Sequence, residues 1–97
     1  MPAELRATSF QGKEGTTFEV AGASCSLTLL KVNVHVQTPK QEAFSLFFEG
    51  PATPFLPQAT YTLRQTNLGE AGIFVVPIGR TKDGFQYEAV FNYIFQS

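Results

Sequence analysis

Two glutamates stand inside otherwise apolar stretches of the sequence, and their type suggests acid–base chemistry. Glu49 and Glu88 both follow large apolar or aromatic residues. A pair of carboxylates held across a sheet can perform general acid–base catalysis, as in glycoside hydrolysis. Carboxylates in such stretches more often face solvent or pair with an arginine, and Arg64 and Arg80 are available. We therefore expect no enzyme, and a hydrolase that uses Glu49 or Glu88 remains only the third hypothesis.

The single histidine and the single cysteine lack the partners that a catalytic triad or a metal site requires. His35 has no second histidine to join it, and the chain contains one aspartate. Cys25 has no resolving cysteine and no basic neighbour in sequence that would lower its pKa. The glycines match neither a phosphate-binding loop nor a dinucleotide fingerprint. We expect no catalytic residue, no metal ligand and no cofactor, with His35 in a structural role and Cys25 packed as a small hydrophobe.

Composition argues against several classes of partner. The 97 residues carry a formal net charge of −1, and only 15% of them are charged. Such a surface attracts neither nucleic acid nor an anionic membrane. The chain shows no apolar window of about 18 residues and no leader pattern at Met1. The lone cysteine suits a reducing compartment, so we expect the cytoplasm, or carriage on an assembled particle.

The elements that position these residues are strands, because side chains alternate between apolar and polar along the chain. The stretch from Ile73 to Ile78 is apolar on both of its alternating faces, which suits a strand covered on both sides. A turn at 79–84 follows, where Asp83-Gly84 favours a glycine at positive φ. The return strand, 85–95, places aromatic residues on one face at a period of two. Together they predict a hairpin at the centre of the domain, with Pro77 at a strand end or a sheet edge.

The longest strand-like run, 26–37, contains a change of phase. Leu27 and Leu29 share one face, whereas Leu30, Val32, Val34 and Val36 share the other. A shift of one residue inside a strand predicts a β-bulge near Leu29-Leu30, or a strand that passes between two sheets. Further strands are expected around 16–20, 43–49 and 60–66, with a polar connection at 38–42.

These patterns predict one all-β domain over residues 1–97. We expect an antiparallel β-sandwich or small barrel of about six to seven strands, because short alternating strands are joined by turns and no helical period persists. Near the N-terminus, Leu5 and Phe10 are expected to pack onto the body. Strand order, and hence sandwich or barrel, stays open.

Two surfaces favour binding. The proline-rich loop 50–58 carries Phe55 and Leu56, which either pack on the core or make a contact site. The last strand keeps its aromatic residues Phe91, Tyr93 and Phe95 close to the chain end, where an apolar edge is normally covered by another subunit. We therefore expect a non-enzymatic interaction or assembly module that binds a protein partner or itself. The alternative is a small-molecule-binding β-barrel with an aromatic-lined pocket.

About half of the chain resembles DUF6916, a family of small bacterial domains of uncharacterised function. The residues that carry the resemblance are Phe44-Ser45-Leu46-Phe47-Phe48-Glu49-Gly50-Pro51, Leu56-Pro57-Gln58, Tyr61-Thr62-Leu63, Leu68-Gly69, Ile73-Phe74-Val75-Val76-Pro77-Ile78-Gly79 and Tyr87-Glu88-Ala89-Val90-Phe91-Asn92. The resemblance implies a compact single domain in bacteria, encoded near phage-tail-like or tail-collar proteins, and brings no catalytic residues to carry over.

Overall fold

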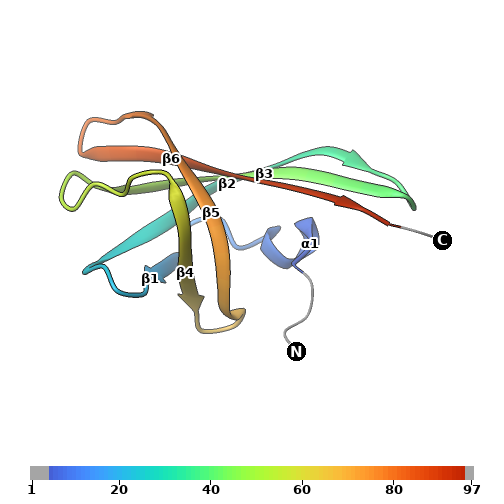
Figure 1. Ribbon diagram of the computed structural model, residues 1–97, viewed down its shortest axis with the longest axis horizontal. Coiled ribbons are helices and arrows are strands. Elements are labelled where there is room, and N and C mark those ends of the chain that lie inside the picture. The colour runs from blue at the N-terminus through green and yellow to red at the C-terminus, as the bar shows by residue number, and fades with distance from the viewer. Residues whose placement is uncertain (1–4, 96–97) are drawn as a thin grey trace.

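A computed structural model describes residues 5–95 and confirms an all-β domain. Its elements are α1 (Ala7–Phe10), β1 (Thr17–Val20), β2 (Cys25–Gln37), β3 (Gln41–Pro51), β4 (Ala59–Gln65), β5 (Gly69–Arg80) and β6 (Gly84–Ile94). Neighbouring strands are antiparallel, and their order β1-β2-β3-β6-β5-β4 closes because β1 also pairs with β4 (Figure 1). The arrangement is therefore a closed barrel, with one four-residue helix that the sequence pattern did not predict.

Three of the strands are longer than the barrel needs. β1 pairs with β2 only over Cys25–Thr28, and β5 pairs with β6 only over Phe85–Glu88. Beyond those points β2, β3 and β6 continue together as a three-stranded sheet, here called the extension, which comprises residues 30–37, 41–47 and 89–94. It projects from the barrel in Figure 1 and accounts for the long dimension of a molecule that measures 44 × 27 × 24 Å.

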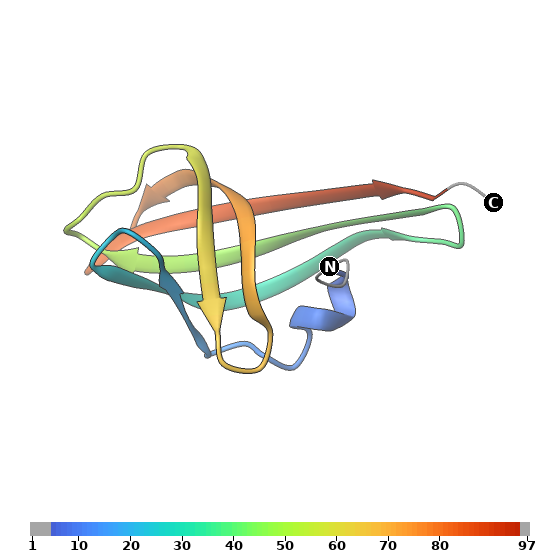
Figure 2. The same cartoon turned by 60° about the horizontal axis from the view of Figure 1, so that its bottom comes forward.

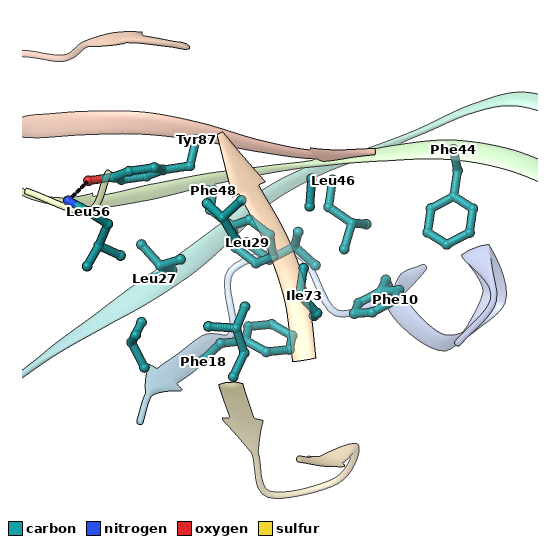
Figure 3. Close-up of a cluster of buried hydrophobic side chains, with 14 of the residues drawn as sticks. Phe10, Phe18, Leu27, Leu29, Phe44, Leu46, Phe48, Leu56, Ile73 and Tyr87 are labelled. Atoms are coloured by element: carbon teal, nitrogen blue, oxygen red, sulfur yellow. Dashed lines mark hydrogen bonds between the residues drawn. The ribbon is translucent and has the colours of Figure 1, made fainter. Parts of the chain in front are cut away.

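The core follows the predicted alternation and runs from the barrel into the extension. Its buried members on the strands are Phe18, Val20, Leu27, Leu29, Phe44, Leu46, Phe48, Leu63, Ile73, Val75, Tyr87 and Ala89 (Figure 3). Phe10 of α1 joins them, as expected, with its ring 6.2 Å from Phe44 and 6.0 Å from Phe91. The helix therefore covers the inner face of the extension, where no barrel wall would otherwise close the core.

A buried carboxylate holds α1 in place. Glu42 is 2% exposed; its Oε2 accepts the Ala7 backbone N–H at 2.7 Å, and its Oε1 accepts Arg6 Nη2 at 3.0 Å. The hydrogen bond from Arg6, then that from Ala7, lowers the pKa of Glu42 below its ordinary value. The prediction that Glu42 lies in a polar connection was wrong, because β3 begins at Gln41. The available signal was spacing, since Glu42 shares the parity of Phe44 and Leu46.

Two bulges interrupt β2. The ladder with β3 shifts between Leu29 and Lys31, which confirms the predicted bulge. A second shift, between Val34 and Val36, was not predicted and leaves His35 outside the regular pairing. Val36 consequently pairs with Ala43 on the outer face, the side of the strands that points away from the core. The expectation that Val36 shares a face with Val34 was therefore wrong.

The β5–β6 hairpin is confirmed, but two of its expected details are wrong. Gly84 is not at positive φ; it opens β6 in close contact with β3, where an added Cβ would overlap the carbonyl oxygen of Gly50. β5 is not covered on both faces, because Phe74 and Ile78 are exposed on its outer side. Pro77 lies inside β5 but beyond the ladder with β4, which ends at Val75, so its missing N–H is no loss on that side.

Candidate interaction surface

Large apolar side chains are exposed mainly on the outer faces of the strands. Within residues 5–95 they are Leu30, Phe55, Phe74, Ile78, Val90 and Ile94. The two most exposed lie on the same strand of the extension: Val90 is 62% exposed and Ile94 is 67% exposed. Exposed apolar residues that gather on one strand are more informative than scattered ones, because single exposed hydrophobics are normal.

The proline-rich loop divides its two large side chains between core and solvent. Leu56 is buried, and its backbone N–H donates to the Tyr87 hydroxyl at 3.1 Å (Figure 3). Phe55 is 46% exposed and rests edge-on against Phe85, with ring centroids 4.8 Å apart. Leu56 therefore anchors the loop, and Phe55 is the side chain that the loop presents.

The predicted aromatic residues of the last strand lie on the face that α1 covers. Phe91 stacks on Phe44 at 4.7 Å, and the Tyr93 and Phe95 rings stack at 6.3 Å. The Arg6 guanidinium lies 4.4 Å from the centre of the Phe95 ring. These side chains are half-buried, so the exposed positions of the same strand are the alternate ones: Val90, Asn92 and Ile94. Sequence reasoning passed over Val90 and Ile94, although apolar residues at positions of polar parity were the signal.

Among residues 5–95, no strand pairs with one edge of β6 in the extension. β3 follows β6 along its whole length, whereas β5 leaves it after Glu88, and neither view shows a described segment beside 89–94 on that side (Figure 2). The Phe95 N–H donates to Lys40 on the β3 side. Because backbone groups alternate along a strand, the N–H and C=O groups of Val90, Asn92 and Ile94 point toward the open side. The segment contains no charged residue, proline or glycine.

Of the residues first considered for chemistry, the two glutamates lie near each other on adjacent strands. Glu49 pairs with Gln86, and Glu88 pairs with Phe47, so the two glutamates are diagonal neighbours on the outer face. His35 is exposed, and its Nε2 lies 2.9 Å from the Ser45 hydroxyl. Burial raises the pKa of the half-buried Cys25 thiol. Within residues 5–95, no group of three metal-binding side chains is assembled.

Two open hollows of the surface lie at the seam where the barrel closes. β1 and β4 pair through only two residue pairs, and two open hollows of about 570 and 600 Å³ flank them. Both are lined by Glu19, Ser26 and Arg64, and the Arg64 Nε lies 3.9 Å from Glu19 Oε1. Neither Glu49 nor Glu88 lines these two hollows. Inside the core, a gap of about 10 Å³ beside Phe10 and Phe18 has room for one water at most.

Comparison with known proteins identifies the family. Residues 5–91 match the family described as Domain of unknown function (DUF6916). The chain belongs to the DUF6916 family. The match includes β1 to β5 and most of β6, so the shared pattern of this DUF6916 domain extends over the barrel and much of the extension. No curated protein and no solved structure matches the chain. In the described part of the domain, no helix has the length and apolar character to cross a membrane.

Proposed function

We propose that this DUF6916 domain is a non-enzymatic assembly module that binds other proteins by adding a strand to β6. The observation that supports the proposal most strongly is the open edge at 89–94, which is uncharged and continues a ladder already formed with β5. Natural proteins usually protect such an edge with a charge, a proline or a bulge. An edge without these devices is suited to pairing with a strand from another chain.

Both faces of the added strand would find apolar neighbours. On the outer face, Val90 and Ile94 are largely exposed and would pack against alternate side chains of an incoming strand. On the inner face, the aromatic rings of Phe91 and Tyr93 are half-buried and present their remaining surface. Main-chain hydrogen bonds would supply affinity, and these side chains would supply selectivity.

The alternative of an aromatic-lined ligand pocket has less support. The aromatic interior leaves a gap of about 10 Å³, far below the roughly 300 Å³ of a small-molecule site. The larger hollows at the seam are open and lined mostly by polar side chains, including Glu19, Ser26 and Arg64. We retain self-association or a protein partner as the mode of action, in the cytoplasm or on an assembled particle. The family resemblance is the ground for extending the proposal to an accessory subunit of a phage-tail-like particle.

A proline at Asn92 tests the proposal. The Asn92 N–H points to the open side, so proline removes a donor that an incoming strand needs and keeps the hydrogen bonds to β3. It also removes the exposed Gln41–Asn92 side-chain hydrogen bond of 3.0 Å. We expect Asn92→Pro to abolish binding of proteins that the wild type captures, by chemical cross-linking, from the cells that produce it.

The matched control is Phe74→Ser, which removes an exposed apolar side chain from the outer face of β5 and leaves the edge of β6 intact. This variant should capture the same proteins as the wild type. Equal capture by wild type and Asn92→Pro, with both proteins folded by circular dichroism, would refute strand addition at β6.

A further inference from the structure

We propose that the strand added to β6 belongs to a second copy of this chain, paired antiparallel about a twofold axis at Asn92. The inference rests on the proposed function, and it names the partner and the register. In this dimer Asn92 faces Asn92 of the second copy. Val90 then faces Ile94 of the second copy, and Phe91 faces Tyr93 of the second copy, each contact occurring twice by symmetry.

The backbone selects this register. Residues paired across antiparallel strands share a face, so in a self-pair their numbers must sum to an even value. The backbone groups of Val90, Asn92 and Ile94 point to the open side, because the Phe95 N–H is committed to Lys40 on the β3 side. A twofold axis at Asn92 makes these three positions the hydrogen-bonded pairs and forms about six main-chain bonds between the copies.

Neighbouring registers are worse. An axis at Phe91 sets Glu88 opposite Ile94 of the second copy and Val90 opposite Asn92, which mismatches an apolar and a polar side chain four times. An axis at Val90 requires Gln86 and Glu88, whose open side is already paired with β5. Of these three registers, the axis at Asn92 is the one that uses only backbone groups without a partner among residues 5–95 and matches apolar with apolar side chains.

The side chains of the β6 edge complement those of the same edge in a second copy, on both faces of the sheet. Val90 and Ile94, the two most exposed large apolar side chains among residues 5–95, become cross-strand neighbours on the outer face. Phe91 and Tyr93 of the two copies meet on the inner face, where aromatic pairs are favourable. Two three-stranded extensions would join into one six-stranded sheet, with the α1 helix of each copy beneath its own half (Figure 1).

The contact closes on itself and is modest in size. Because both copies use the same edge, pairing at β6 ends with two chains and does not propagate into a fibre. The β2 edge of the extension is unsuited to continue the sheet, since it carries Lys31, His35 and two bulges. A pair of six-residue strands falls below the roughly 1,200 Å² of stable complexes, so we expect a dissociation constant in the micromolar range.

Charge exchange at Asn92 tests both the partner and the register. Sedimentation velocity of the wild type should show a monomer–dimer equilibrium between about 1 and 300 μM. Asn92→Lys and Asn92→Asp, each alone, place like charges across the axis and should weaken dimerisation by about tenfold. An equimolar mixture of the two variants should form dimers again, because only a heterodimer then pairs opposite charges at the axis.

Thr62→Lys and Thr62→Asp are the matched controls, since Thr62 is exposed on β4, away from the edge. Both should dimerise like the wild type. A wild type that stays monomeric at 300 μM would refute the second copy as partner, and dimers that persist in both charged variants would refute the register. Neither result would refute strand addition to a different protein. That proposal is refuted only if Asn92→Pro captures the same proteins as the wild type. Thermal unfolding of each variant checks that it is folded.

Discussion

The extension has two edges, and the chain treats them differently. The β2 edge carries Lys31 and His35 and is broken by bulges at Leu30 and His35. The β6 edge is regular from Ala89 to Ile94 and has no charge, proline or glycine. Bulges and lysines prevent an edge strand from pairing with a strand of another chain. One edge is thus protected against association, whereas the other is open to it.

The difference teaches that the barrel and the extension solve separate problems. Pairing of β1 with β4 closes the barrel and leaves it without free edges. A closed sheet therefore needs no further feature to prevent unwanted pairing. The extension gives up that closure and depends on α1 to cover its inner face. Its unprotected β6 edge is the basis of the proposed interaction, and each prediction below tests whether the two edges differ for the reasons given.

Removing the support beneath both edges should have the largest effect. Phe10 is 1% exposed and contacts Phe18, Phe44 and Phe91. We expect Phe10→Ala to lower the free energy of unfolding by about 3–5 kcal/mol, measured by urea denaturation. Phe55→Ala, a matched change at an exposed ring, should cost less than about 1 kcal/mol. Equal losses would show that α1 does not support the extension.

Loss of the carboxylate that holds α1 should have the next largest effect. Glu42→Gln keeps the side-chain shape but weakens charge-assisted hydrogen bonds to Arg6 and Ala7. We expect the free energy of unfolding to fall by about 1.5–3 kcal/mol. Arg64→Ala, which removes the exposed ion pairs to Glu19 and Glu70, should change it by less than about 1 kcal/mol. A Glu42→Gln protein as stable as the wild type would contradict the anchoring role.

Glu42 should also make the free energy of unfolding depend on pH. Its pKa in the folded protein is lowered from 4.5 by the Arg6 and Ala7 hydrogen bonds. Since a lowered pKa means that folding favours the charged form, the stabilisation is complete above the unfolded-state pKa and is lost as the pH falls through the folded-state pKa. Denaturation of wild type and Glu42→Gln at a series of pH values should show their difference shrinking below about pH 4.5. A constant difference would exclude Glu42 as the source.

Converting the protected edge into an open one should have a smaller effect, on association. Deletion of His35 removes the second bulge, because Val34 and the following residue would then pair in register with Phe44 and Ala43. We expect self-association to rise several-fold by light scattering, because the β2 edge becomes flatter. His35→Ala keeps the bulge and should associate like the wild type. If both variants behave alike, the bulge does not protect the edge.

The elements could largely be predicted from the sequence, because alternation is local. The strands, the β5–β6 hairpin and the bulge at Leu30 all followed from spacing, whereas the burial of Phe10 was expected only from its apolar side chain. The bulge at His35 was hidden because Val34 and Val36 are both apolar, so no change of pattern marks it. The four-residue α1 is too short to show a helical period. The pairing of β1 with β4 joins residues that lie far apart in the sequence, so a local pattern cannot predict it.

The candidate surface was predicted in part. The last strand was selected for its aromatic residues Phe91, Tyr93 and Phe95, which the structure places on the covered face. For the proline-rich loop, core packing and a contact site were both left open, and the structure exposes Phe55 and buries Leu56. The exposed Val90 and Ile94 could not be distinguished from buried residues without knowing that the outer face of the extension lacks a covering layer. Which edge is open depends on where β5 leaves β6, and that follows from barrel closure rather than from any short stretch.

Amide hydrogen exchange at the two edges, measured by NMR as a function of protein concentration, tests the central claim most directly. The account predicts that the amides of Val90, Asn92 and Ile94 exchange fast in dilute protein and become protected as the concentration rises through the micromolar range. Exchange along the β2 edge, from Lys31 to Gln37, should stay unchanged. Protection of Asn92 that does not depend on concentration, or that rises equally on both edges, would contradict the account.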